Sequence, residues 1–93
     1  MDKPLVLVID DEPDIRELLS ITLQRMKLRV ETAEDLTSAK TLLESGRFDL
    51  CLTDMRLPDG DGLELVEWIQ QHFASIPVAV ITAESTGSRS RTC

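Results

Sequence analysis

At the centre of this chain stands the segment Leu50-Cys51-Leu52-Thr53-Asp54-Met55-Arg56-Leu57-Pro58-Asp59-Gly60-Asp61-Gly62, in which an apolar run ends at Asp54 and an acidic loop begins. Two other apolar runs end in a similar way. The first, Leu5–Ile9, stops at Asp10-Asp11-Glu12, and the last, Val78–Ile81, stops at Thr82-Ala83. If the three runs are parallel neighbours in one sheet, their carboxyl ends bring three carboxylates and a hydroxyl into one crevice. Such an oxygen-rich crevice suits a hard divalent cation and a phosphoryl group.

The segments between these runs predict helices. Pro13 suits the first turn of a helix that extends to about Lys27 and carries residues at helical spacing, namely Ile15, Leu18, Leu19, Thr22 and Met26. Asp35 is expected to cap a second helix, which Gly46 ends, and Asp61 to cap a third. Further strands are expected at residues 28–32, near a sheet edge, and at residues 48–53.

The order of these elements predicts the fold class. Strands that alternate with helices indicate right-handed parallel crossovers, and the uninterrupted apolar run Leu5–Ile9 is typical of a strand covered on both faces. We therefore expect an α/β fold with an open parallel sheet, built from about four strands and three helices.

Composition limits the function classes. Ninety-three residues, 42% of them hydrophobic but with only one Trp and two Phe, are sufficient for one small domain with an aliphatic core. A formal charge of -7 argues against direct binding to nucleic acid, which depends on Lys and Arg. The first apolar run is too short for a signal sequence or a membrane span. We therefore expect a cytoplasmic chain without membrane contact.

The two cysteines and the C-terminal segment carry no motif. Cys51 lies within an apolar run and Cys93 is the last residue, so the pair lacks the spacing of a metal site or a disulfide framework. Free thiols fit a reducing cytoplasm. From residue 84 onward the only apolar residue is Cys93. The predicted domain therefore spans residues 3–83, and residues 84–93 are expected to be a disordered or non-native tail.

The acidic crevice indicates phosphoryl chemistry. A carboxylate accepts a phosphoryl group as a mixed anhydride if the charge crowded around it is neutralised, and Mg2+ is suited to this with oxygen ligands and retained waters. We expect Asp11 and Asp54 as direct ligands, Asp10 as a ligand through water, and the backbone carbonyl of Arg56 as a further ligand. The hydroxyl of Thr82 is placed to bond the phosphoryl oxygens and to pull the following loop inward.

Simpler roles compete with this interpretation at single positions. An isolated Asp more often caps a helix or stabilises a turn, and Asp59 and Asp61 are assigned to a turn and a cap. Cys51 and Met55 are assigned to packing, and His72 to a solvated helix end. The combination of a doubled Asp, a lone Asp and a Thr after three separate strands is what favours the phosphoryl site.

These motifs resemble the receiver domains of two-component response regulators. Val8-Ile9-Asp10-Asp11-Glu12-Pro13 is similar to the first strand and acidic pair of that family, and Leu52-Thr53-Asp54-Met55-Arg56-Leu57-Pro58-Asp59-Gly60 to its phosphoacceptor segment. Val80-Ile81-Thr82-Ala83 is similar to its switch segment. The resemblance covers residues 3–83 and is strongest to regulators of the NtrC class, including pilus-gene regulators, whose output is sigma-54-dependent transcription. It implies a CheY-like, flavodoxin-like sheet.

The resemblance also implies the roles of single residues. Asp54 is expected to accept a phosphoryl group from the His of a sensor histidine kinase or from a small phosphodonor. Asp10 and Asp11 are expected to hold Mg2+, while Thr82 and the backbone at Ala83 contact the phosphoryl group. The kinase is expected to dock near the first helix, around Ile15, Leu18 and Leu19. The resemblance thus implies a bacterial signalling domain and phosphoprotein rather than an enzyme.

The chain also departs from the family pattern. Receivers continue with a fourth helix, a fifth strand that ends in a Lys facing the phosphoryl group, and a fifth helix, so the resemblance implies truncation before these elements. None of Lys3, Lys27 and Lys40 follows a buried strand late in the chain. We therefore expect impaired phosphorylation, and self-association or dimerisation through the exposed last strand, Val78–Ile81.

Two other functions remain open at this point. One is a signalling-dead interaction fragment that binds the kinase or a partner receiver without switching. The other is a phosphohydrolase that also forms an aspartyl phosphate. Such enzymes use a second Asp two residues after the nucleophile, where this chain has Arg56, and the phosphohydrolase is therefore disfavoured.

Overall fold

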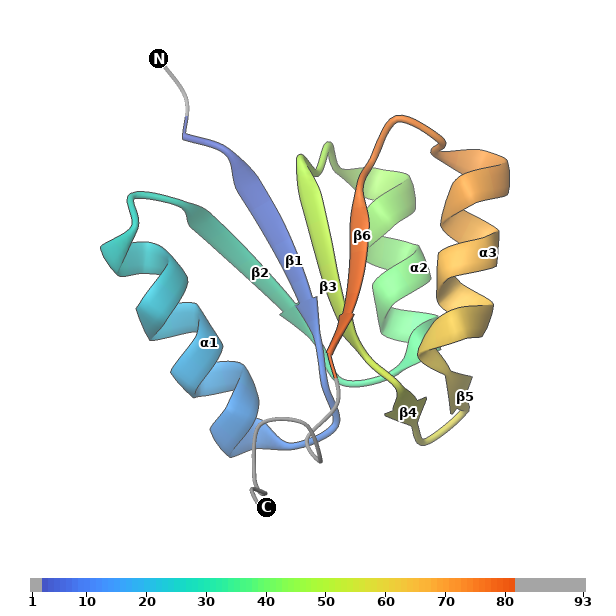
Figure 1. Ribbon diagram of the computed structural model, residues 1–93, viewed down its shortest axis with the longest axis horizontal. Coiled ribbons are helices and arrows are strands. Elements are labelled where there is room, and N and C mark those ends of the chain that lie inside the picture. The colour runs from blue at the N-terminus through green and yellow to red at the C-terminus, as the bar shows by residue number, and fades with distance from the viewer. Residues whose placement is uncertain (1–2, 82–93) are drawn as a thin grey trace, which may run out of the picture.

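The strands expected from the apolar runs assemble into one parallel sheet in the order β2-β1-β3-β6 (Figure 1), in a computed structural model that describes residues 3–81. The elements along the chain are β1 (Leu5–Ile9), α1 (Pro13–Arg25), β2 (Arg29–Ala33), α2 (Leu36–Ser45), β3 (Leu50–Asp54), β4 (Arg56–Leu57), β5 (Gly60–Asp61), α3 (Gly62–His72) and β6 (Val78–Ile81). The expected α/β class and parallel sheet are confirmed, with three helices and four sheet strands among the described residues. β1 and β3 are neighbours in the register Ile9↔Thr53, and β3 and β6 in the register Asp54↔Ile81.

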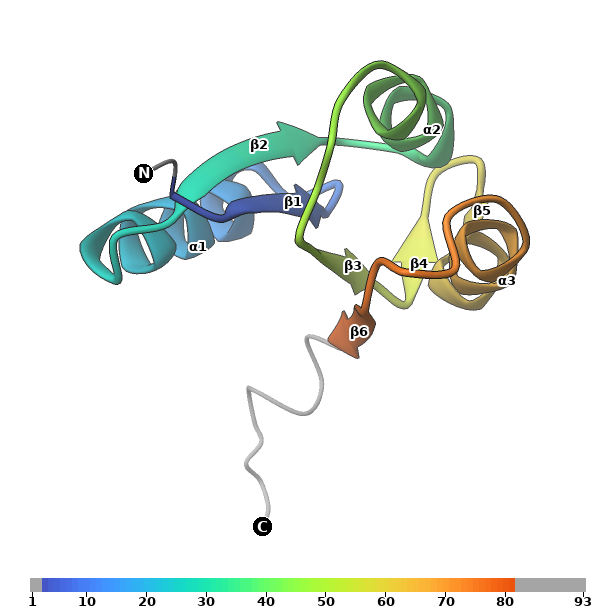
Figure 2. The ribbon, with the colours of Figure 1, turned by 90° about the horizontal axis from the view of Figure 1, so that it is seen from above.

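Helices cover both faces of the sheet. α1 lies on one face, and α2 and α3 lie on the other (Figure 2). On the α1 face, Val6 and Val8 pack with Leu23, whereas Leu7 and Ile9 belong to the core on the α2 and α3 face. These four of the five β1 side chains are at most 1% exposed. Because burial of one such side chain contributes about 1.5–3 kcal/mol, β1 is apolar at every position instead of alternating.

The sheet-facing side of α1 includes a residue outside the set expected at helical spacing. Leu23 is 9% exposed and contacts the sheet with the partly buried Leu19, whereas Leu18 is 60% exposed and Met26 62% exposed. Leu18 and Met26, two of the residues expected at helical spacing, are therefore exposed, whereas Leu23, which was not among them, faces the sheet. Apolar residues occupy two adjacent stripes of this helix, and the position of the sheet decides which stripe is buried.

α1 also ends two residues before the predicted end at Lys27. The N–H of Lys27 donates to the carbonyl of Gln24 (3.0 Å), and the N–H of Leu28 donates to the carbonyl of Leu23 (3.2 Å). This pair of hydrogen bonds is a Schellman motif, which requires a left-handed residue after the cap. Lys27 has φ 68° and occupies that position, where glycine is the usual residue.

Lys27→Gly should therefore stabilise the chain. A side chain in the left-handed region costs about 1–2 kcal/mol, which glycine avoids. Part of this gain is lost because glycine gives the unfolded chain more conformational entropy. We expect the free energy of unfolding to rise by about 0.5–1 kcal/mol in urea denaturation. Lys27→Ala is the control, because it removes the charge but keeps the Cβ atom. An equal gain from Lys27→Ala would assign the effect to the lysine side chain and contradict this explanation.

The loop after β3 contains an antiparallel hairpin that the sequence predicted only as a turn. β4 and β5 pair through Arg56↔Asp61 and Leu57↔Gly60, with Pro58 and Asp59 as the turn. The expected caps are present, because Asp35 accepts a hydrogen bond from the N–H of Ser38, and Asp61 accepts one from the N–H of Glu64. Within residues 3–81, no helix has the length and apolar character needed to cross a membrane.

Candidate metal centre

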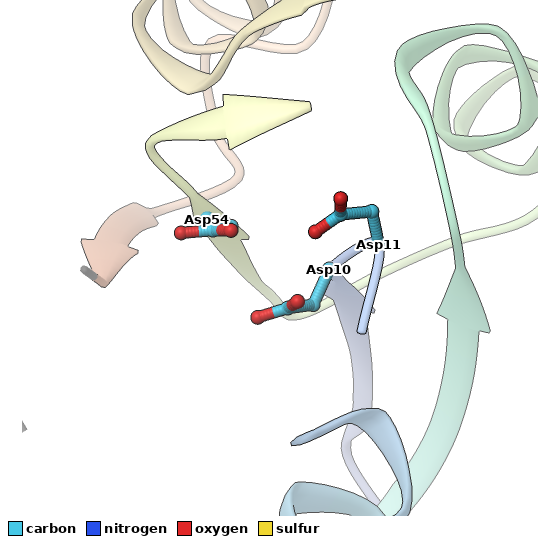
Figure 3. Close-up of side chains that lie close together, drawn as sticks. All are labelled: Asp10, Asp11 and Asp54. Atoms are coloured by element: carbon cyan, nitrogen blue, oxygen red, sulfur yellow. The ribbon is translucent and has the colours of Figure 1, made fainter. Parts of the chain in front are cut away.

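Three carboxylates meet at the carboxyl edge of the sheet, as expected from the strand ends. One carboxylate oxygen each from Asp10, Asp11 and Asp54 lies within 4.8 Å of the others (Figure 3). Asp10 and Asp11 follow β1, and Asp54 ends the neighbouring β3. The acidic groups come together because these two strands are neighbours. From the sequence alone, this followed only if the apolar runs were parallel neighbours in one sheet.

Asp10 is the most buried of the three. Its side chain is 5% exposed, and its Oδ1 accepts a hydrogen bond from the N–H of Glu12 at 2.9 Å. Its backbone N–H donates to the carbonyl of Ala33 (3.1 Å), and its carbonyl accepts from Nη1 of Arg16 (2.7 Å). These bonds hold the residue between β1, β2 and α1.

Burial makes the charge of Asp10 unfavourable. Desolvation raises the pKa of its carboxyl, the nearby charge of Asp11 raises it further, and the hydrogen bond from Glu12 partly opposes this. A carboxyl whose pKa is raised by folding makes its full contribution to the stability of the fold at pH values below its ordinary pKa. This contribution is lost as the pH rises through the pKa that the group has in the folded chain. Ionised Asp10 therefore destabilises the metal-free fold at neutral pH. A bound divalent cation offsets this cost, so the carboxylate set fits a hard cation such as Mg2+.

Asp54 is half-buried at the end of β3. Its Oδ1 accepts a hydrogen bond from the N–H of Met55 (2.8 Å), and this N–H also reaches the carbonyl of Ile81 (3.2 Å). Its carbonyl accepts from the hydroxyl of buried Thr53 (3.0 Å). Thr82 and Ala83 come directly after Ile81 but lie outside the described residues, and their expected roles stay predictions.

Gly62, at the start of α3, packs against the backbone that carries Asp54. A Cβ atom at this position would overlap the Asp54 carbonyl oxygen and approach the Cα of Met55 to 3.3 Å. The N–H of Gly62 donates to the Met55 carbonyl at 2.6 Å. No side chain fits between α3 and the strand end, so glycine is required for this close approach.

Asp59 has a contact that sequence reasoning missed. It lies in the predicted turn, but its Oδ1 also accepts from the N–H of Leu36 (2.8 Å). Its Oδ2 accepts from the N–H of Thr37 (3.1 Å) and from the Thr37 hydroxyl (2.9 Å). The bond from Leu36 is the main cause that lowers the pKa of Asp59. No local pattern marks this contact, because the two segments are 23 residues apart.

The residues assigned to packing and to a helix end are placed largely as expected. Cys51 is 0% exposed, and burial raises the pKa of its thiol to about 12, so the thiol is protonated at neutral pH. Met55 is half-buried. His72 is exposed at the end of α3, where its ring stacks on Trp68 with 4.8 Å between centroids.

A family comparison agrees with this geometry. Residues 6–93 match the family model described as the response regulator receiver domain. The chain is 59% identical over 83 residues to the response regulator protein PilR of Pseudomonas aeruginosa, covering 89% of this chain and 19% of PilR. It is 34% identical to the DNA-binding transcriptional regulator NtrC of Proteus hauseri, covering 91% of this chain and 18% of NtrC. The chain thus spans about a fifth of the length of these two relatives.

The fold also resembles solved receiver structures. The response regulator TrrA of Thermotoga maritima, in complex with Mg2+ and BeF, superposes with a TM-score of 0.84 at 36% identity, covering 95% of this chain and 76% of TrrA. The chemotaxis response regulator CheY4 of Vibrio cholerae has a TM-score of 0.84 at 32% identity, covering 89% of this chain and 71% of CheY4.

Proposed function

Because this chain belongs to the response regulator receiver domain family, with an NtrC-class receiver sequence, we propose that Asp54 accepts a phosphoryl group in a two-component phosphorelay. The observation that supports this most strongly is the meeting of Asp10, Asp11 and Asp54 within 4.8 Å at the ends of two adjacent parallel strands. A phosphoacceptor carboxylate with two further acidic side chains beside it is what a metal-assisted transfer requires.

The residues that would hold Mg2+ are Asp11, Asp54 and the backbone carbonyl of Arg56, with Asp10 acting through water. Bound there, Mg2+ would neutralise the charge of the carboxylates and of the incoming phosphoryl oxygens. The hydrogen bond from Met55 to Oδ1 of Asp54 orients that carboxylate. The buried position of Asp10 keeps its charge close to the other two carboxylates.

The proposed transfer forms one bond and breaks another. A carboxylate oxygen of Asp54 attacks phosphorus, and the bond between phosphorus and the donor atom breaks. The donor is the His nitrogen of a sensor histidine kinase or the oxygen of a small acyl phosphate. The donor atom leaves with the electron pair of the broken bond, and Asp54 becomes a mixed anhydride. Thr82 and the Ala83 backbone are proposed to contact the phosphoryl oxygens.

We propose the α1 surface as the kinase contact, since Leu18 is 60% exposed there beside the half-buried Ile15 and Leu19. Among the described strands, β2 and β6 are the two edges of the parallel sheet, and we propose β6 as the strand for self-association. A transcriptional output and a cytoplasmic location are further parts of the proposal. The transcriptional output is supported by the similarity to the DNA-binding transcriptional regulator NtrC, and the cytoplasmic location by membership of the receiver domain family.

Incubation with acetyl phosphate and Mg2+, followed by intact mass measurement, tests the proposal. We expect an adduct with the mass of one phosphoryl group, which is absent when a chelator removes Mg2+. A chain that binds Mg2+ without forming an adduct would contradict phosphoacceptance and would favour a fragment that only binds partners. Continuous turnover of a phosphate ester would instead favour a phosphohydrolase. The exposed Arg56 argues against this function, because it lies two residues after Asp54, where such enzymes use a second Asp.

A further inference from the structure

Asp59 connects the loop after Asp54 to a distant helix. Its carboxylate accepts the N–H groups of Leu36 and Thr37 at the start of α2, while the local cap Asp35 accepts the N–H of Ser38. The first N–H groups of a helix have no partner within the helix. Two of these three donors in α2 are therefore satisfied from the β4–β5 turn and not from the neighbouring sequence.

The β4–β5 hairpin is attached to the molecule on both sides. Towards α2, Gly60 lies so close to Leu36 that a Cβ atom would overlap Leu36 Cδ1. Towards α3, Asp61 caps the helix, and the N–H of Gly62 donates to the Met55 carbonyl. Asp59 supplies the polar attachment to α2. Its loss would leave that side of the hairpin held mainly by apolar contact.

Arg56 lies on β4 of this hairpin, two residues after Asp54 and three before Asp59. Its carbonyl is the proposed backbone ligand, and Mg2+ demands nearly ideal octahedral geometry at about 2.0–2.1 Å from each oxygen. A carbonyl on a loose hairpin would meet this demand only at an entropic cost. The position of the hairpin therefore bears directly on metal affinity.

We propose that Asp59 is a positioning residue for the Mg2+ site, which it serves by fastening the β4–β5 hairpin to the N-terminus of α2. It contacts neither the metal nor the phosphoryl group. This inference rests on the proposed function, because it takes the Arg56 carbonyl as a ligand. A residue that merely capped α2 would alter stability and leave Mg2+ affinity unchanged.

Two alanine variants of the 93-residue chain separate these roles. Asp59→Ala removes the distant cap, and Asp35→Ala removes the local cap of the same helix from a residue outside the hairpin. Asp59→Asn keeps one carbonyl oxygen as an acceptor and tests rescue. For each variant, calorimetric titration with MgCl2 gives the dissociation constant, urea denaturation gives the midpoint, and amide hydrogen exchange in metal-free protein reports on residues 55–61.

We expect both alanine variants to lower the urea midpoint. Only Asp59→Ala should weaken Mg2+ binding, by about 10-fold, as is found for groups that orient metal ligands. The same variant should accelerate amide hydrogen exchange in the hairpin. Asp59→Asn should fall between Asp59→Ala and the wild type. Unchanged Mg2+ affinity in Asp59→Ala, or an equal loss in Asp35→Ala, would overturn the positioning role. A wild-type chain that binds no Mg2+ would overturn the proposed function together with this inference, so the wild-type titration distinguishes the two failures.

Discussion

Asp54→Asn should reduce phosphoryl transfer from acetyl phosphate to background. The neutral amide does not form the mixed anhydride, since it lacks the negative charge of a carboxylate and is a much weaker nucleophile. Oδ1 of Asp54 already accepts a hydrogen bond from Met55, which an asparagine oxygen can also accept, so the local geometry should persist. The measurement is the fraction of phosphorylated chain by intact mass, with and without Mg2+.

The same variant should stay folded, and its free energy of unfolding without Mg2+ should equal or exceed that of the wild type. Asparagine removes one of three carboxylates that lie within 4.8 Å of one another, and this lowers their mutual repulsion. Glu44→Gln is the matched control, because Glu44 is an exposed carboxylate in the last turn of α2. Phosphorylation should be normal in Glu44→Gln. An adduct that persists in Asp54→Asn would place the acceptor at another residue.

Gly62→Ala should destabilise the chain and impair phosphorylation together. Helix propensity alone predicts a gain of about 1 kcal/mol for alanine over glycine. The new Cβ atom would, however, overlap the carbonyl oxygen of Asp54, which is backbone and has little room to shift. Overpacking of this kind costs about 1–3 kcal/mol or more. We therefore expect the steric cost to exceed the propensity gain, with a lower free energy of unfolding in urea.

Relief of that overlap would displace the segment that carries Asp54 and Met55. A displacement of about 1 Å costs on the order of 100-fold in rate, which sets the expected loss in adduct formation. Gly46→Ala is the control, since the atom nearest to its Cβ atom would belong to the ring of Phe48, at 3.3 Å, and not to the backbone. We expect a change of less than about 0.5 kcal/mol there. A Gly62→Ala chain as stable and as active as Gly46→Ala would show that α3 moves away freely.

Most of the candidate metal centre could be predicted from local sequence. Asp10, Asp11 and Asp54 each follow or end an apolar run, and the carboxyl ends of parallel strands share one edge of a sheet. The helix caps Asp35 and Asp61 were likewise predictable, because a cap accepts an N–H only three residues away. The bounds of β1 and β6 agree with the apolar runs themselves.

Features that depend on distant segments were not predictable in this way. The hairpin strands β4 and β5 have two residues each, too few for a periodic pattern. The face of α1 that is buried could not be predicted, since two apolar stripes satisfy the helical spacing and only the sheet selects Leu19 and Leu23.

Local pattern thus determines the three helices, the four strands of the parallel sheet, the local caps Asp35 and Asp61, and the acidic residues at the strand ends. Hydrogen bonds within a few residues and burial of apolar runs act at short range. Tertiary structure decides which strands are neighbours, that Gly62 must accommodate the backbone of Asp54, and that Asp59 caps a helix 23 residues away. The physical reason is that these contacts join segments brought together by packing, and neither segment carries a signal of the other.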